Sequence, residues 1–159
     1  MGFGLKGGKF SSGATGKFFL GASNSFAIEA NLTVKKNFHT GMSTVFLEMQ
    51  KPFFNNLLQI PLDYIVGVGA HSAFYKAGYY KIRDGQADRY YGSGVSVGVD
   101  AKVGLEYTWN FFPLTTSIEA CPMMDLINRG PEKLELAFTV RYIMGATAGT
   151  GRKFGGTRR

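Results

Sequence analysis

Residues 94–109 read GVSVGVDAKVGLEYTW, and from Val95 onward two kinds of side chain alternate without an error. The odd positions are apolar, namely Val95, Val97, Val99, Ala101, Val103, Leu105, Tyr107 and Trp109. The even positions are polar or glycine, namely Ser96, Gly98, Asp100, Lys102, Gly104, Glu106 and Thr108. Because successive side chains of a β-strand point to opposite faces of its sheet, this stretch predicts one long strand with an apolar face and a polar face.

Seven other stretches show the same two-residue period. It is clear at 26–35, 62–76 and 133–144 and less regular at 3–10, 15–22, 42–51 and 114–121, and no segment shows a helical period. Short connections at 24–25, 52–57 and 110–113 alternate with the connections 11–14, 36–41, 77–93 and 122–132. We therefore expect an all-β fold of eight antiparallel strands in up-and-down order, closed into a barrel without free edges and with its long loops at one end.

Alternation alone does not say which face points inward, but three features favour a transmembrane barrel with the polar face inside. The polar face contains glycines that a narrow eight-stranded interior needs, and no helix is predicted of the kind that packs on a soluble carrier barrel. The apolar faces carry no charge and end in aromatic residues, which we expect to form girdles at the two membrane interfaces. The girdle residues are Phe74, Tyr75, Trp109, Phe111 and Phe112. A soluble, lipocalin-like carrier barrel remains the alternative.

The length of 159 residues predicts a single domain, and the 45% of hydrophobic residues argues against a disordered chain. Much of the net charge of +7 lies in residues 145–159, a Gly-rich segment with Arg152, Lys153, Arg158, Arg159 and no acidic residue. We assign residues 1–144 to the barrel and residues 145–159 to a flexible basic tail. Four charges without a folded motif do not indicate a nucleic-acid partner.

Residues 2–144 resemble the small eight-stranded outer-membrane β-barrel proteins of the OmpX and OmpA-barrel type. The resemblance is carried by Gly-x-Gly-Ala-His at 67–71 and by Gly-Val-Asp…Gly-Leu-Glu-Tyr at 98–107, which an aromatic turn and Pro113 follow. It implies an integral protein of the bacterial outer membrane that contacts outer-membrane lipid and lipopolysaccharide, without catalytic residues or a cofactor. The chain departs from the family pattern because fifteen residues follow Met144, where such barrels usually end on an aromatic residue. The first twenty residues lack the apolar core of a signal peptide, so we expect a mature exported chain.

With the polar face inward, the interior would hold nearly balanced charges. The predicted interior residues are the carboxylates Glu29, Glu48, Asp63, Asp100, Glu106, Glu119 and Glu135, the cations Lys6, Lys17, Lys35, Lys102, Lys133 and Arg141, and His71. They fit an ion or proton pathway, a paired-carboxylate acid–base site, or a plug of salt bridges. We favour the plug, because an eight-stranded barrel has little room for a water-filled channel.

The long connection 77–93 is the second candidate site, because it is rich in tyrosine and arginine, which are enriched at binding hot spots. The candidate recognition residues are Tyr79, Tyr80, Arg83, Arg89, Tyr90 and Tyr91. An exposed loop stiffened by tyrosine stacking and local ion pairs is the plainer interpretation. His39, His71 and Cys121 do not form a metal-ligand set by their spacing, and Cys121 is expected to be inert.

The sequence therefore predicts a non-enzymatic outer-membrane barrel with a plugged interior. It would act through its extracellular loops, or as a structural or accessory subunit beside other outer-membrane or periplasmic proteins. A membrane-embedded lipid-modifying enzyme, a narrow channel and a soluble carrier are the alternatives.

Overall fold

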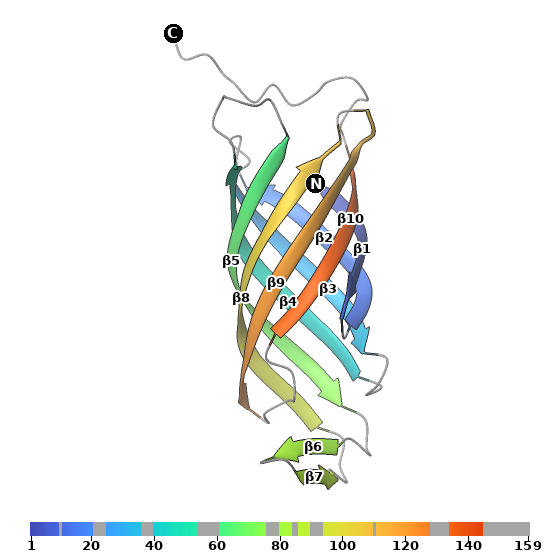
Figure 1. Ribbon diagram of the computed structural model, residues 1–159, viewed down its shortest axis with the longest axis vertical. Helices are drawn as coiled ribbons and strands as arrows, with labels where there is room; N and C mark the ends of the chain where they lie inside the picture. Colours follow the sequence, from blue (N-terminus) through green and yellow to red (C-terminus); the bar gives the residue numbers. More distant parts are fainter. Residues whose placement is uncertain are drawn as a thin grey trace.

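The structure is a computed structural model that describes residues 1–9, 11–20, 25–35, 40–53, 61–75, 80–83, 86–89, 94–109, 111–127 and 134–144. At 35, 40, 75, 80–83 and 86–89 it describes the backbone without the side chains. Eight strands form one closed barrel in the order β1-β10-β9-β8-β5-β4-β3-β2 (Figure 1). Their bounds are β1 Gly2–Gly8, β2 Ser11–Leu20, β3 Phe26–Lys35, β4 Thr40–Pro52, β5 Leu62–Tyr75, β8 Gly94–Thr108, β9 Leu114–Ile127 and β10 Leu134–Ile143.

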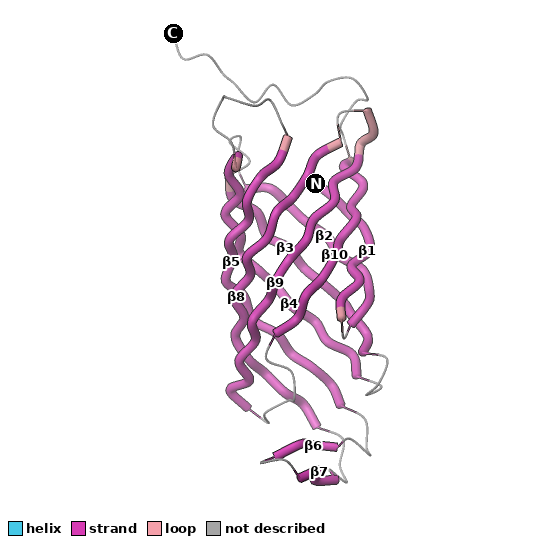
Figure 2. Tube along the Cα trace, viewed as in Figure 1, coloured by secondary structure: helices cyan, strands magenta, loops and turns pink. Residues whose placement is uncertain are grey.

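Every neighbouring pair in the barrel is antiparallel, and β1 closes the barrel by pairing with β10 from Gly2 opposite Ile143 to Gly8 opposite Ala137. The tube in Figure 2 shows the strands tilted around a common axis, with strand structure throughout the described wall. The predicted all-β, up-and-down, eight-stranded barrel is thereby confirmed. None of the described residues belongs to a helix that is long and apolar enough to cross a membrane.

The two ends of the barrel differ in their connections. We call the end that carries the connections after β1, β3, β5 and β9 the loop end, and the opposite end, where β1 begins and β10 ends, the turn end. Beyond the loop end, within the connection from β5 to β8, two short strands pair as a separate sheet (Figure 1): β6 Tyr80–Arg83 and β7 Gln86–Arg89. The predicted tail 145–159 lies outside the described residues.

Three predicted boundaries are wrong, each for a physical reason. Residues 11–14 belong to β2 rather than to a connection, because their side chains are all small and hide the alternation. Strand β9 continues past Cys121 to Ile127, because the long β8 supplies pairing partners beyond Pro122. The connection 77–93 contains β6 and β7, which are separated by Asp84 and Gly85, the dipeptide that favours a two-residue hairpin turn.

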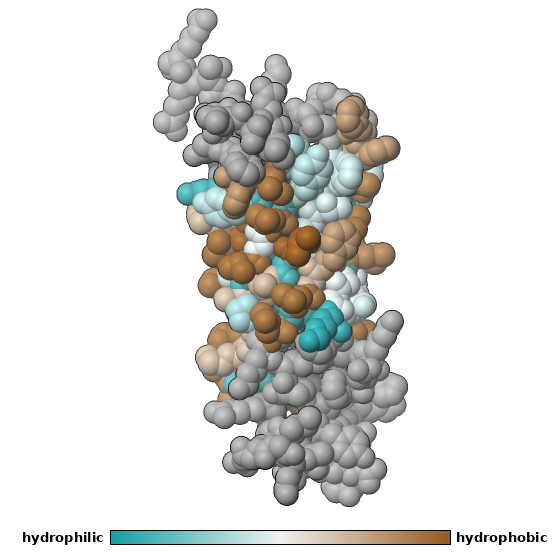
Figure 3. Space-filling view, in the orientation of Figure 1, coloured by the Kyte–Doolittle hydropathy of each residue, from teal (hydrophilic) through white to brown (hydrophobic). Residues whose placement is uncertain are grey.

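The barrel has a polar interior and an apolar exterior. Outward-pointing side chains such as Leu5, Leu32 and Ile118 are 72%, 67% and 68% exposed, and hydrophobic side chains dominate the described surface in Figure 3. Among the side chains that the structure describes in the eight barrel strands, Lys51 is the one charged residue that points outward. Charged side chains therefore gather inside, on the polar face of the alternating strands.

Glycines make room for the interior side chains. In the strand register, Gly69 lies opposite Phe46, Gly67 opposite Glu48, Gly98 opposite His71, Gly104 opposite Glu119 and Gly4 opposite Arg141. A Cβ atom on Gly69 would lie 2.6 Å from the Phe46 ring, and one on Gly98 would lie 2.4 Å from His71 Cε1. A large side chain on one strand thus fills the space that the missing side chain of its neighbour leaves, which gives the interior its close packing.

The predicted girdle residues lie at both ends. Phe74 is exposed near the loop end, while Trp109, Phe111 and Phe112 are exposed at the turn between β8 and β9. Trp109 packs edge-to-face against Tyr107 with ring centroids 5.2 Å apart. The side chain of Tyr75 lies outside the described part of the chain.

Candidate functional site

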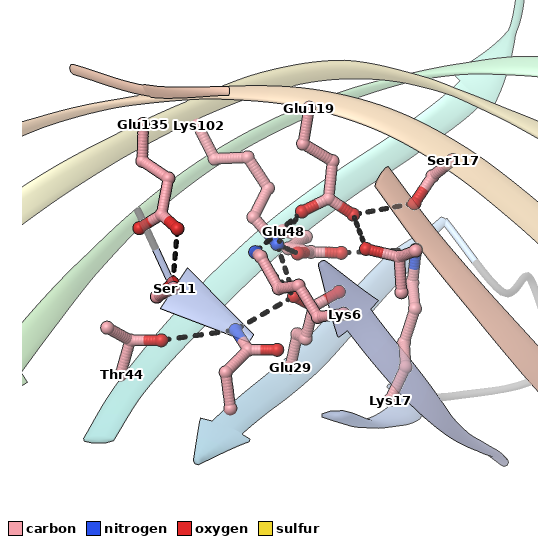
Figure 4. A network of polar contacts seen from close by, with 12 residues as sticks. Lys6, Ser11, Lys17, Glu29, Thr44, Glu48, Lys102, Ser117, Glu119 and Glu135 are labelled. Atoms are coloured by element: carbon pink, nitrogen blue, oxygen red, sulfur yellow. Dashed lines mark hydrogen bonds and ion pairs between the residues drawn. The ribbon is translucent and has the colours of Figure 1, made fainter. Parts of the chain in front are cut away.

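The barrel interior holds a network of eight buried charged side chains. Figure 4 labels Lys6, Lys17, Glu29, Glu48, Lys102 and Glu119 among them. Four are cations and four are carboxylates, namely Lys6, Lys17, Lys102 and Arg141, and Glu29, Glu48, Glu106 and Glu119. Their formal charges sum to zero. We call these eight residues the central network. They come from seven of the eight barrel strands, and the eighth, β5, faces them with Gly67 and Gly69.

Lys102 lies at the centre of this network. Its Nζ atom donates to Glu29 Oε1 and to Glu48 Oε1, each at 2.5 Å, and lies 3.3 Å from Glu119 Oε2. The same ammonium group sits 4.3 Å from the ring centroid of Phe46, an inward aromatic residue. The buried charge of Lys102 is therefore surrounded by three carboxylates and one aromatic face, which together offset its loss of hydration.

Arg141 joins the other side of the network. Its Nη1 donates to Glu106 Oε2 at 2.7 Å, and its Nη2 donates to Glu119 Oε1 at 3.0 Å and to Glu29 Oε2. A guanidinium group offers donors in a rigid planar fork, so one side chain can bind three carboxylates from β3, β8 and β9. Arg141 thereby connects strands that are not neighbours in the barrel.

Lys6 and Lys17 complete the network from β1 and β2. Lys6 Nζ donates to Glu119 Oε2 at 2.8 Å, and Lys17 Nζ lies 3.1 Å from both Glu48 Oε2 and Glu106 Oε2. Two interior cavities flank these lysines, each of about 10 Å³, one beside Lys17 and Arg141 and one beside Lys6 and Phe46. A cavity of that size holds about one water molecule.

A second group of polar side chains lies nearer the loop end and consists of His71, Ser96, Asp100 and Asp125, which we call the loop-end cluster. His71 Nδ1 lies 2.7 Å from Asp100 Oδ1, and His71 Nε2 lies 2.8 Å from Asp125 Oδ1. Ser96 Oγ donates to Asp125 Oδ1 at 2.7 Å. Asp100 is completely buried, whereas the Asp125 side chain is 10% exposed.

Two smaller contacts lie on either side of the central network. Gln50 Nε2 donates to Asp63 Oδ2 at 2.5 Å and to Glu106 Oε1 at 3.0 Å, which attaches Asp63 to the network. Ser11 Oγ donates to Glu135 Oε1 near the start of β10. Every carboxylate that the sequence places inside therefore has a polar partner in the interior.

The structure places the predicted interior residues as follows. Glu29, Glu48, Glu106, Glu119, Lys6, Lys17, Lys102 and Arg141 form the central network, His71 and Asp100 belong to the loop-end cluster, and Asp63 and Glu135 make the separate contacts. Lys133 and the side chain of Lys35 lie outside the described residues. So do the side chains of the predicted recognition residues, of which Tyr80 and Arg83 belong to β6 and Arg89 to β7.

Sequence reasoning missed several interior residues, chiefly Phe46, Gln50 and Asp125. Phe46 and Gln50 share the parity of Glu48 on β4, so the two-residue period contained the signal. Asp125 shares the parity of Cys121, but the predicted end of the strand at 121 removed it from the interior.

The interior chemistry is that of mutual neutralisation. Within the described ranges, no group of three or more His, Cys, Asp and Glu side chains is arranged to hold a metal ion. Cys121 is buried and free. Ser96 bonds to Asp125 rather than to His71, so the loop-end cluster lacks the serine–histidine contact of a nucleophilic triad.

Comparisons of the chain with protein-family models, with curated proteins and with solved structures give no match. The resemblance to the OmpX and OmpA-barrel type therefore stays a prediction from the sequence, and function has to be argued from the barrel itself.

Proposed function

We propose that the chain is a non-enzymatic integral β-barrel protein of the bacterial outer membrane, with a plugged interior. It would act through its loop end, or as a structural or accessory subunit beside other outer-membrane or periplasmic proteins. Its immediate surroundings would be outer-membrane lipid and lipopolysaccharide.

The observation that carries the proposal is the distribution of charge between the two faces of the wall. The interior contains at least four buried cations with their carboxylates, while the described outward side chains of the eight barrel strands include one charge, Lys51. In hydrocarbon every backbone polar group must be paired within the protein, a condition that a closed barrel meets. Aromatic side chains at both ends, such as Phe74 and Trp109, match the interfacial girdles of membrane barrels.

The filled interior favours a plug over a channel. Lys102 and Arg141 both bind Glu29 across the barrel axis, and the two cavities beside the network are each about 10 Å³. An ion pathway requires a continuous row of water-accessible sites. A lipid-modifying enzyme would instead need an apolar cavity large enough for an acyl chain, at positions that charged side chains occupy here.

The proposed location in a membrane is tested by introducing an arginine at two outward positions that would lie at different depths in the bilayer. Val103 points outward near the middle of β8, and Ser12 points outward near the loop end of β2. In lipid vesicles, Val103→Arg should lower the free energy of unfolding by about 2–4 kcal/mol, and the matched control Ser12→Arg by about 0–1 kcal/mol. Equal, small effects at both positions, together with solubility as a monomer without detergent, would show that the outward face is not in lipid.

The functional part is tested by purification from native membranes in mild detergent. The full chain is compared with a variant whose residues 79–91 are replaced by a Gly/Ser linker, which surface loops tolerate. We expect a partner that co-purifies with the full chain to be lost from the variant. A partner retained by both chains would place the binding surface elsewhere on the barrel.

A further inference from the structure

The last five residues of β9, Met123–Ile127, form an overhang at the loop end. On one side, the pairing of β10 with β9 begins at Leu134 opposite Pro122, so among the described residues no β10 partner reaches the overhang. On the other side, the pairing with β8 is irregular between Val97 and Gly98. The ladder also omits the two register positions at Pro122, which has no N–H to donate. Among the described residues, the backbone of this segment is therefore paired on one side only, with β8.

The loop-end cluster adds side-chain bonds to this segment. His71 on β5 reaches past β8 to Asp125 on the overhang, with Nε2 2.8 Å from Oδ1, while its Nδ1 lies 2.7 Å from Asp100 Oδ1 on β8. The path is open because Gly98 lies opposite His71, and a Cβ there would come within 2.4 Å of the ring. One imidazole ring thus connects three strands at the point where the ladder is interrupted.

The number of protons on this ring decides whether both bonds exist. A neutral imidazole has one N–H and one lone pair, whereas the imidazolium ion has two N–H groups. An ionised carboxylate only accepts hydrogen bonds. Both contacts of His71 can therefore be hydrogen bonds only when the cluster carries one extra proton. The reference is a neutral imidazole ring between two ionised carboxylates. Without that proton, a nitrogen lone pair would face a carboxylate oxygen.

We propose that His71 is a proton-dependent latch that holds the Met123–Ile127 overhang against the barrel wall. When pH rises, the extra proton passes to water at the loop end. The neutral ring keeps its Nδ1–H on the fully buried Asp100, and the bond to the partly exposed Asp125 is the one that is lost. The overhang then opens, while the central network stays closed.

The groups around His71 support this assignment of the responding element. From β8 they are Asp100 and the hydroxyl of Ser96, and from β9 the carboxylate is Asp125. On β4, Thr44 lies opposite His71 and does not titrate. Of the titratable side chains described in contact with His71, both are therefore carboxylates, and both favour the doubly protonated ring.

The test measures amide hydrogen exchange of the intact chain in detergent micelles between pH 5 and pH 10. Protection factors are compared for peptides covering 123–127 and, as an internal reference, 103–107 in the middle of β8. We expect protection of 123–127 to fall about tenfold or more as pH rises, the opening expected from losing one charged hydrogen bond, with no matching change at 103–107. Equal behaviour of the two peptides would overturn the latch.

Three variants isolate the ring. His71→Gln should remove the pH transition, and His39→Gln, which changes the other histidine of the chain, should leave it intact. Asp125→Asn should keep the overhang protected at both pH values, because an amide either donates to or accepts from the ring. A transition that persists in Asp125→Asn would overturn the proposal, even if His71→Gln failed to fold. In His39→Gln, imidazole ¹⁵N spectra should show two N–H groups at low pH, and a single N–H there would refute the assigned proton count.

Discussion

The central network and the loop-end cluster are both buried polar groups in the same barrel, yet they are built differently. In the central network each cation contacts at least two carboxylates, and Lys102 and Arg141 each contact three. In the loop-end cluster the single ring of His71 contacts both Asp100 and Asp125. The first connects seven strands around the barrel, and the second connects three adjacent strands at one edge.

The comparison shows that the number of partners around a buried charge decides whether that charge affects the whole barrel or one local segment. Where several partners surround each charge, no single proton or rotamer controls the arrangement, and the whole barrel depends on the sum. Where one ring connects two carboxylates, its protonation controls a local segment and leaves the rest unchanged. We therefore expect substitutions in the central network to act on global unfolding, and those in the loop-end cluster to act on local opening.

The largest effect should come from Arg141→Met. The change leaves Glu29, Glu106 and Glu119 without a guanidinium partner in the interior. Uncompensated burial of charge predicts a loss of about 3–5 kcal/mol in the free energy of unfolding, measured by urea titration in lipid vesicles.

The charge-balanced double variant Arg141→Met/Glu106→Gln serves as the control. It should recover a large part of that loss, because the network is again neutral and the amide at 106 still accepts and donates hydrogen bonds. If Arg141→Met left stability unchanged while the parent barrel conducted ions steadily, the interior would be a channel lining instead of a plug.

The fold could be predicted from the sequence because alternation survives over long stretches such as 94–109, and because a barrel of eight strands follows from their number and connections. Alternation also places Glu29 and Arg141 on the polar face of their strands. Which carboxylate each cation binds could not be predicted, because that depends on the register between strands. The same holds for the pairing of Gly69 with Phe46, since it depends on the register between β4 and β5.

The loop end was harder to predict for two reasons. The hydropathy alternation of β9 ends at Met123 and Met124, which are both apolar, so Asp125 was assigned to a connection although it keeps the inward parity of Cys121. The hairpin β6–β7 was missed inside a tyrosine-rich stretch, although Asp84-Gly85 between two short runs signals a two-residue turn.

A smaller effect should come from Gly69→Ala, which tests how closely the Phe46 ring packs against Gly69 beside the central network. The new Cβ would lie 2.4 Å from Val45 O and 2.6 Å from the Phe46 ring, so strand and ring must shift. Overpacking of this kind predicts a loss of about 1–3 kcal/mol in the free energy of unfolding. The matched control is Gly7→Ala on β1, where an added Cβ meets no atom within 4 Å, and its effect should be close to zero. Equal losses at both positions would point to backbone entropy rather than to packing.

The smallest effect should come from Ser96→Ala, and it sharpens the comparison because Ser117→Ala is the same substitution in the central network. Both hydroxyls donate to a carboxylate, Ser96 Oγ to Asp125 at 2.7 Å and Ser117 Oγ to Glu119 at 2.6 Å. Asp125 is partly exposed and keeps its bond to His71. Ser96→Ala should therefore lower the free energy of global unfolding by at most about 0.5–1.5 kcal/mol, while amide exchange rises at 123–127. Ser117→Ala weakens a fully buried contact, so its cost should instead appear in global unfolding, with exchange raised around the whole barrel. If both variants raised exchange over the same residues, the two clusters would be one cooperative unit, and the division between global network and local latch would be wrong.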